Sequence, residues 1–241
     1  MAKIPDKPDQ IFEEFTSDYK QIFGDDLKSI ILYGSAARGE YIPKKSDINF
    51  LVILSDVGIE RFPEALDTVK KWEKLKVAIP LLLTEKYIEN SLDSFPIEFL
   101  NLSSHYRVIF GKDVFDGIKL DRNDLRLQVE RELKGKLLNL RQAYFQAAKD
   151  PKSADLLIKE SFGTFLSLFP AILHLKEESI SSSSLENIRR TALIFKLDPQ
   201  VFERLYRIKQ GNEKLKKSES LDFLRKYIKQ IRSLALQADA L

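Results

Sequence analysis

The sequence contains no cysteine, and among its 241 residues it has only one methionine, one tryptophan and two histidines. The lack of cysteine excludes disulfide bonds and thiolate metal sites, and it fits the cytoplasm, which is the location we expect. The two histidines, His105 and His174, are isolated from each other in the sequence, which favours structural roles over catalytic ones. Cysteine-based chemistry is therefore excluded.

Long hydrophobic runs and a large excess of one charge are missing as well. No apolar run approaches the ~20 residues of a transmembrane helix. The first ten residues, MAKIPDKPDQ, lack the apolar core of a signal peptide. The net charge of +3 is too small to indicate a nucleic-acid partner. With 44% hydrophobic and 31% charged residues, the composition fits a soluble globular protein that needs neither a membrane nor a nucleic acid.

The strongest functional signal lies in residues 29–54. An apolar run there ends in Gly34-Ser35, the eleven residues Ala36–Ser46 form a connection, and Asp47-Ile48-Asn49 begins a second apolar run. Glycine lets the backbone approach a ligand closely, and a serine hydroxyl beside the amides of a helix start can hold a phosphate. Residues 47 and 49 are two apart on the expected strand, so their side chains share a face, and two acidic side chains there would suit Mg²⁺.

Each of these features also has a structural interpretation. Gly34-Ser35 alone is compatible with an ordinary strand-to-helix turn, and Asp47 with a cap of the strand or of the turn before it. Asn49 leaves three alternatives: a metal ligand, a nucleotide contact, or the trace of a lost metal site. Arg38 could neutralise a triphosphate or be a solvated surface cation.

The stretch resembles the nucleotidyltransferases of the DNA polymerase β-like superfamily, whose signature is Gly-Ser followed, after a short connection, by Asp-x-Asp or Asp-x-Glu. The aminoglycoside and minimal nucleotidyltransferases are the most similar types. The resemblance implies that a nucleoside triphosphate, with ATP as the first choice, binds at Gly34, Ser35, Arg38 and Ser46. It also implies that Asp47 is catalytic and that Asp47 and Asn49 ligate Mg²⁺. Asn49 replaces the second acid of the signature, so we expect weakened metal binding.

The superfamily uses a third carboxylate as metal ligand and general base. The apolar strand expected at Val77–Leu83 contains no acid, and its Pro80 indicates an edge position or a bulge. The next candidate is Glu98, inside the apolar, strand-like run Phe95–Leu100. A carboxylate buried there would need a reason such as a metal. The alternative is a solvent-facing glutamate or one paired with Arg107.

The periodicity together with this resemblance implies an α+β fold: a nucleotidyltransferase domain at residues 1–120, with a mixed sheet flanked by helices, and an α-helical bundle at residues 121–241. The elements expected in the first domain are helices at 9–23, from 35 to 39 and at 60–74, and strands at 28–33, 48–54, 77–83 and 106–110. A long helix is expected at 122–149. Further helices should begin near Ser153, Ser183, Asp198-Pro199 and Ser218 or Ser220.

Together these features favour transfer of a nucleoside monophosphate from the triphosphate to a hydroxyl of an unknown small-molecule or protein acceptor. The alternative is a catalytically inactive nucleotidyltransferase fold that serves as a nucleotide-binding or protein-interaction module, as in an antitoxin. The Arg…His signature of toxin ribonucleases is absent. A homodimer is an assembly that the resemblance to the aminoglycoside enzymes allows.

Overall fold

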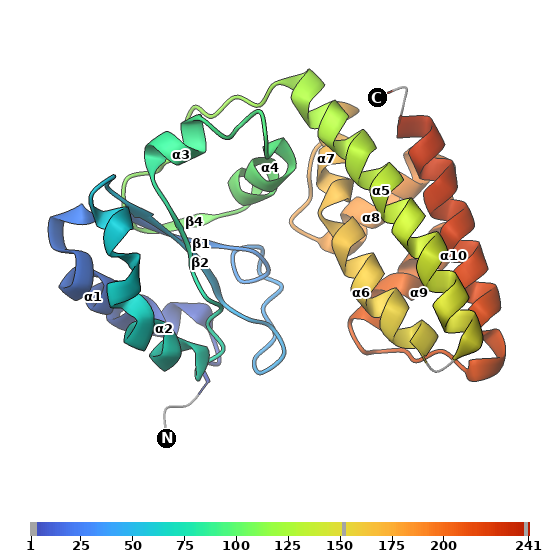
Figure 1. The fold of residues 1–241 in the computed structure, drawn as a ribbon, viewed down its shortest axis with the longest axis horizontal. Coiled ribbons are helices and arrows are strands. Elements are labelled where there is room, and N and C mark those ends of the chain that lie inside the picture. The colour runs from blue at the N-terminus through green and yellow to red at the C-terminus, as the bar shows by residue number, and fades with distance from the viewer. Residues whose placement is uncertain (1–3, 151–152, 239–240) are drawn as a thin grey trace. The chain divides into compact units, whose positions relative to one another are not determined.

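The computed structural model describes residues 4–150, 153–238 and 241 (Figure 1). By internal contacts the chain forms two compact units. The first unit comprises the chain up to Leu92 together with Leu102–Lys119, and the second comprises Asp93–Asn101 and the chain from Leu120 onwards.

The first unit contains a four-stranded mixed sheet with the order β3-β2-β1-β4. Its strands are β1 (Leu27–Tyr33), β2 (Asn49–Leu54), β3 (Leu81–Leu83) and β4 (Arg107–Gly111). Strand β1 is antiparallel to β2 and β4, and β3 is parallel to β2. Pro80 directly precedes the edge strand β3, where its missing N–H costs no ladder hydrogen bond. The mixed sheet is the one that the sequence predicts.

Helices pack against the sheet, and their side chains form the hydrophobic core of the first unit together with those of the strands. They are η1 (Pro8–Ile11), α1 (Phe12–Phe23), η2 (Gly24–Asp26), η3 (Gly58–Ala65), α2 (Leu66–Glu73) and α3 (Glu85–Glu89). The ring of Phe15 on α1 stacks on that of Phe50 on β2, with centroids 4.1 Å apart, and contacts Trp72 on α2 edge-on. All three side chains are fully buried, which fixes α1 and α2 on one face of the sheet.

Two predictions for this unit are wrong. Residues 35–39 form hydrogen-bonded turns instead of a helix. The segment 60–74 is a 3₁₀ helix followed by the short helix α2, so its apolar spacing does not give one continuous buried stripe. Phe62 and Leu66 are 58% and 57% exposed, while Trp72 is buried as expected.

The run Phe95–Leu100 is helical, against the predicted strand. Helix α4 (Pro96–Ser104) begins at Pro96, and proline is favoured at the first position of a helix because its missing N–H would have no intrahelical acceptor. The short apolar run could not distinguish a strand from a buried helix. Residues 93–101, and so most of α4, belong to the second unit.

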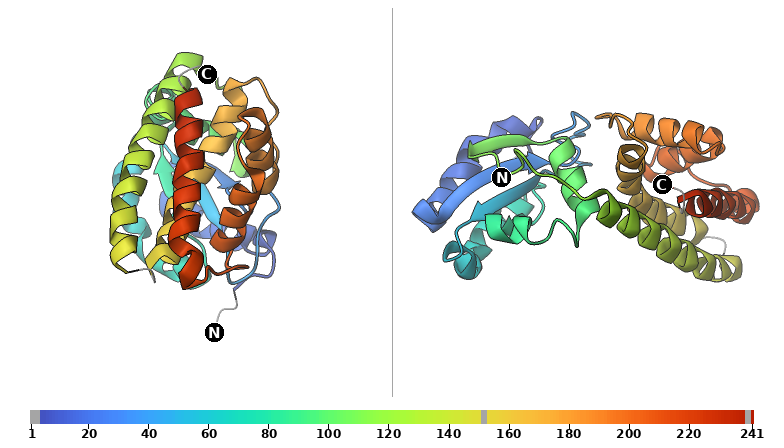
Figure 2. Two further views of the ribbon diagram at one scale, coloured as in Figure 1. Left: turned by 90° about the vertical axis from the view of Figure 1, so that its right-hand side faces the viewer. Right: turned by 90° about the horizontal axis from the view of Figure 1, so that it is seen from above.

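The second unit is a bundle of helices α5 (Arg122–Lys149), α6 (Ala154–Leu166), α7 (Leu168–Leu175), α8 (Ser184–Ile194), α9 (Pro199–Lys209) and α10 (Lys217–Gln237). Helices α5 and α10 pack side by side (Figure 2). Two of the predicted caps are present: Ser183 Oγ accepts from the N–H of Glu186, and Asp198 Oδ1 accepts from that of Gln200. Ser153 lies at the N-cap position of α6 but makes no capping side-chain hydrogen bond. The last helix begins at Lys217, just before the predicted Ser218 or Ser220.

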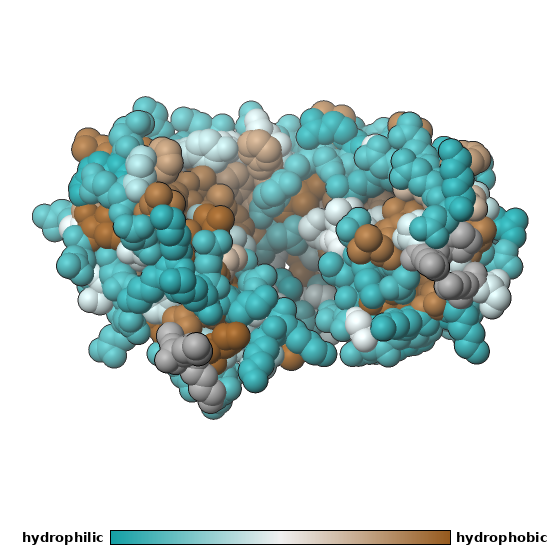
Figure 3. Space-filling view, turned by 60° about the horizontal axis from the view of Figure 1, so that its bottom comes forward, coloured by the Kyte–Doolittle hydropathy of each residue, from teal (hydrophilic) through white to brown (hydrophobic). Residues whose placement is uncertain are grey.

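The centre of the bundle is aromatic. Phe162 contacts Phe169, Phe202 and Tyr227 at centroid distances of 6.2, 6.4 and 6.1 Å. By length and composition alone, the segment Ala154–Leu175 could cross a membrane, which the sequence prediction missed. Its aromatic side chains Phe162, Phe165 and Phe169 are buried in the bundle, as in a core helix. Hydrophobic patches also reach the surface among polar side chains, as on the face in Figure 3.

Candidate functional site

The turn after β1 brings Gly34 against Asn49. Gly34 has a φ of +75°, a conformation that side chains rarely adopt, and its carbonyl accepts from the N–H of Arg38 at 3.2 Å. A Cβ added at Gly34 would lie 3.1 Å from Nδ2 of Asn49. Position 34 therefore favours glycine for two reasons, its backbone angle and the close approach of the Asn49 side chain.

Asp47 and Asn49 lie at the start of β2, as their spacing predicts: Asn49 is the first residue of the strand, and Asp47 precedes it by two residues. Asn49 pairs with Tyr33 across the β1–β2 ladder, and its Nδ2 donates to the carbonyl oxygen of Asp47 at 3.3 Å. Ile48 between them is fully buried, whereas Asp47 is exposed. Because side chains alternate along a strand, Asp47 and Asn49 turn away from the core that holds Ile48. The structure thus joins Gly34, Asp47 and Asn49 in one place.

Lys76 completes this group, and the sequence analysis missed it. Its Nζ lies 3.5 Å from Oδ1 of Asp47, and its carbonyl oxygen accepts from the N–H of Ile48 at 2.9 Å. The next residue, Val77, forms a parallel bridge with Ile48. The contact depends on the pairing of segments far apart in the chain, so it could not be predicted from the local sequence.

Arg38 is held by a neighbouring acid. Its Nε lies 3.3 Å from Oε2 of Glu40, and both side chains are partly buried. His105 lies in the same electrostatic environment: burial lowers the pKa of its imidazole, the Arg38 charge lowers it further, and Glu40 opposes the shift. A triphosphate that binds Arg38 would therefore compete with Glu40 for its guanidinium group. His105, expected to be structural, adjoins the loop.

The two predicted serines differ in their surroundings. Ser46 shapes the loop: its Oγ accepts from the N–H of Ile42 at 3.1 Å, and its own N–H donates to the Ile42 carbonyl at 2.8 Å. Its hydroxyl hydrogen can still donate to a ligand. The carbonyl of Ser35 accepts from the N–H of Glu40 at 2.9 Å, which orders the turn beside Gly34. Ser35 and Ser46 stay predicted triphosphate contacts.

Glu98 lies in the second unit, on α4. Gln128 on α5 donates from Nε2 to Oε2 of Glu98 at 2.8 Å and accepts with Oε1 from the N–H of Ile97 at the same distance. The guanidinium of Arg107, the alternative partner of Glu98, lies over the ring of Phe12 in the first unit. The first unit thus supplies Asp47 and Asn49 without Glu98, whose catalytic role stays a prediction.

The donor set at Asp47 fits a magnesium ion that arrives with its triphosphate. Within residues 4–150, 153–238 and 241 there is no group of three or more Asp, Glu, His or Cys side chains that could hold a metal ion. Mg²⁺ nevertheless keeps several waters and is commonly bound by one or two carboxylates together with phosphates. Asp47 supplies one carboxylate and Asn49 one amide oxygen, which is enough for an ion whose other ligands are water and phosphate oxygens.

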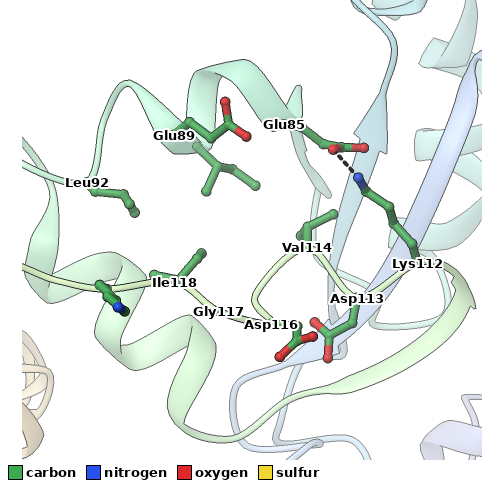
Figure 4. Close-up of a pocket in the computed structure, with 11 residues that line it drawn as sticks. Glu85, Glu89, Leu92, Lys112, Asp113, Val114, Asp116, Gly117 and Ile118 are labelled. Carbon is green, nitrogen blue, oxygen red and sulfur yellow. Dashed lines mark ion pairs between the residues drawn. The ribbon is translucent and has the colours of Figure 1, made fainter.

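A separate cavity of about 290 Å³ lies between α3 and residues 112–119 (Figure 4). Lys112 forms an ion pair with Glu85 at its wall. Asp113 is held in place, because it accepts from the Tyr106 hydroxyl at 2.7 Å and from the N–H of Phe115 at 2.9 Å. These contacts engage Glu85, Lys112 and Asp113 within the protein, and none of the predicted site residues lines the cavity.

Known proteins resemble this chain in both sequence and structure. The family model described as a nucleotidyltransferase domain matches residues 9–104. The chain is 30% identical over 151 residues to a "Putative protein adenylyltransferase" of Methanocaldococcus jannaschii, a match that covers 61% of this chain and 95% of that one. The structure of spectinomycin adenyltransferase from Enterococcus faecialis, with ATP and spectinomycin, aligns with a TM-score of 0.49 and 12% identity, over 90% of this chain and 99% of that one.

The region that the family model matches contains the predicted site. Residues 9–104 include the turn at Gly34, the Asp47–Asn49 segment at the head of β2, and Glu98. The relative from Methanocaldococcus jannaschii is covered almost completely, so the similarity extends well beyond a short motif. The chain belongs to the nucleotidyltransferase domain family of the DNA polymerase β-like superfamily.

Proposed function

We propose that this nucleotidyltransferase is an adenylyltransferase, which transfers AMP from ATP to a hydroxyl group of an acceptor. The observation that carries the proposal is the close approach of Gly34 to the Asn49 side chain, whose Nδ2 in turn donates to the main-chain carbonyl of Asp47, inside the matched domain. The choice of ATP rests on the name of the relative from Methanocaldococcus jannaschii. That name also favours a protein as the acceptor.

Different residues of the site would bind the triphosphate and the metal ion. The backbone at Gly34 offers close approach to the triphosphate, and the hydroxyls of Ser35 and Ser46 can donate to its oxygens. Asp47 and Asn49 would hold Mg²⁺, which when bound neutralises charge that develops on the phosphates. Arg38 and Lys76 are two cations of this region, paired with Glu40 and Asp47 respectively.

The reaction itself is a displacement at the α-phosphorus. The acceptor hydroxyl oxygen forms a bond to that phosphorus, the bond to the bridging oxygen of the β-phosphate breaks, and pyrophosphate leaves. The hydroxyl proton passes to a carboxylate, for which Glu98 is our candidate. Such reactions depend mainly on positioning and charge stabilisation, so the single full negative charge of Asp47 should limit the rate.

Calorimetric titration with ATP, in the presence and absence of Mg²⁺, tests the proposal. We expect magnesium-dependent binding that Asp47→Ala abolishes. Asp67→Ala is the matched control, because Asp67 is an exposed aspartate of the same unit whose ion-pair partner is Lys70. Binding that survives Asp47→Ala, or no binding of ATP, would refute the assignment. ATP binding without release of pyrophosphate from ATP in the presence of any tested acceptor would instead support the inactive alternative.

A further inference from the structure

A groove of about 570 Å³ runs between α1 and β4, outside the predicted nucleotide site. This volume falls within the roughly 300–1,000 Å³ that is usual for ligand sites. Val108, Ile109 and Phe110 line it from β4, and Thr16 and Ser17 line it from α1. Among the described residues, strand β4 is an edge of the sheet and pairs with β1 alone, so one of its two backbone edges has no partner strand.

Two cations without a carboxylate partner lie in this groove. Lys20 Nζ is 4.0 Å from the centroid of the Phe110 ring, and the Arg107 guanidinium is 5.2 Å from that of Phe12. Both side chains are exposed. Across the described part of the chain, neither makes an ion pair, and Glu13 is the one acid of the lining. Stacking on a ring orients each cation and leaves its N–H donors available to an anion.

The spacing of the cations defines what can reach both. Phe12 and Lys20 are eight residues apart on α1, which is about 12 Å along a helix. Arg107 and Phe110 are three residues apart on β4, which is about 10 Å along a strand. Because Lys20 lies on Phe110 and Arg107 on Phe12, the two cations mark opposite ends of the groove. An extended chain advances about 3.3 Å per residue and residues four apart share a face, so acidic side chains at that spacing span this distance.

We propose that the α1–β4 groove binds an extended, acidic segment of a partner protein, with its main chain along the open edge of β4 and its carboxylates on Lys20 and Arg107. Addition of a strand to a sheet edge is a common mode of peptide recognition. A second copy of this chain fits poorly, because a two-fold interface would oppose one basic groove with another. The proposal goes beyond the adenylyltransferase function, and binding in this groove requires no nucleotide.

Fluorescence anisotropy of a labelled nonapeptide of serine and valine, with two glutamates four residues apart, tests the proposal on the full chain without ATP. We expect saturable binding that weakens about tenfold in the double variant Lys20→Gln/Arg107→Gln, since two charge pairs of modest strength are lost. Ser17→Trp should also block binding, because it fills the groove from an exposed helix position without a change of charge. Circular dichroism of each variant verifies its fold.

The matched control is Lys74→Gln/Lys86→Gln, which removes two exposed lysines of the same unit outside the groove and should leave binding unchanged. Equal binding of the glutamine version of the peptide, or undiminished binding by Lys20→Gln/Arg107→Gln, would overturn the proposal. A dimer that Ser17→Trp dissociates in sedimentation would assign the groove to a second copy. An oligonucleotide that displaces the peptide at lower concentration would assign it to nucleic acid. Either result would overturn the acidic-segment proposal.

Discussion

Lys76 Nζ lies 3.5 Å from Oδ1 of Asp47, the carboxylate of the first unit that we predict to ligate the metal. Side-chain exposures of 45% for Lys76 and 54% for Asp47 make this a surface ion pair of modest strength. The ammonium group nevertheless opposes any cation that binds Asp47. With Asn49 in place of a second acid, the local charge of Asp47 and Lys76 together is zero. Metal binding in this site should therefore depend on the charge that a triphosphate adds.

The variant Lys76→Met tests this dependence. Removal of the ammonium should tighten Mn²⁺ binding in the absence of nucleotide by about 1.5- to 5-fold, which corresponds to the ~0.2–1 kcal/mol of an exposed ion pair. Electron paramagnetic resonance titration of free Mn²⁺ measures it. The gain should shrink in high salt, because salt screens exposed charges. Lys86→Met is the control, and weaker Mn²⁺ binding by Lys76→Met would contradict the argument.

Asn49→Asp restores the acid of the superfamily signature. A second carboxylate beside Asp47 supplies a full negative charge where Asn49 offers an amide oxygen, so Mg²⁺ and Mn²⁺ should bind more tightly. The same change removes the Nδ2 donor to the Asp47 carbonyl, so the protein without metal should lose stability. Calorimetry with Mn²⁺ and thermal unfolding measure the two effects. Asn90→Asp, at the C-cap of α3, is the control, and an unchanged metal affinity in Asn49→Asp would count against the assigned site.

Gly34→Ala should destabilise the first unit and weaken ATP binding. The φ of +75° costs a side chain about 1–2 kcal/mol, and the new Cβ would meet Asn49 Nδ2 at 3.1 Å. Gly39→Ala is a close control: its φ is +78°, yet no atom lies within 4 Å of the added Cβ. Both variants should lose the strain energy, measured by urea unfolding. Only Gly34→Ala should displace Asn49 and reduce affinity for ATP, and equal affinities in the two variants would separate Gly34 from the site.

Glu98→Gln distinguishes a catalytic carboxylate from a structural one. Gln128 Nε2 can donate to an amide oxygen as it does to Oε2 of Glu98, so the variant should keep its stability. If Glu98 takes the acceptor proton, pyrophosphate release should fall by about 10²- to 10⁴-fold, the usual contribution of a general base. The affinity of the variant for ATP, measured by calorimetry, should stay near that of the wild type. Full turnover in Glu98→Gln would remove Glu98 from the mechanism.

Much of the fold could be predicted because its signals are local. Helix α5 has the predicted bounds, and Ser183 and Asp198 cap α8 and α9 as their positions indicate. The glycine turn and the Asp47–Asn49 segment were found by their spacing along two adjacent strands. The run Phe95–Leu100 was misassigned because a short apolar segment suits a strand or a helix equally. Pro96 at the first helical position was the available signal.

The remaining site features depend on contacts between distant parts of the chain. Lys76 lies beside Asp47 because Val77 forms a parallel bridge with Ile48, and this pairing of distant segments has no local signal in the sequence. Glu40 is two residues from Arg38, but whether the pair forms depends on how the 34–46 loop turns. Such contacts follow from tertiary structure, which overrides local patterns.

His105 should make the stability of the first unit depend on pH. Burial and the charge of Arg38 lower the pKa of its imidazole below the ordinary value of 6.5. The unfolded chain therefore binds a proton at a higher pH than the folded one does. The free energy of unfolding should consequently be highest above pH 6.5 and should decrease as the pH falls through 6.5 towards the folded pKa.

Urea unfolding at a series of pH values, with the first unit's Trp72 as the fluorescent probe, measures this contribution. The variant His105→Gln should lose less stability than the wild type between neutral pH and the folded pKa. Arg38→Gln should raise the pKa of His105, observed in its imidazole NMR signals, because one of the groups that lowers it is gone. Since Glu40 acts in the opposite sense, Glu40→Gln should lower that pKa further. A His105 pKa that does not respond to either change would place the imidazole outside the Arg38–Glu40 pair and would leave burial as the sole cause of the shift.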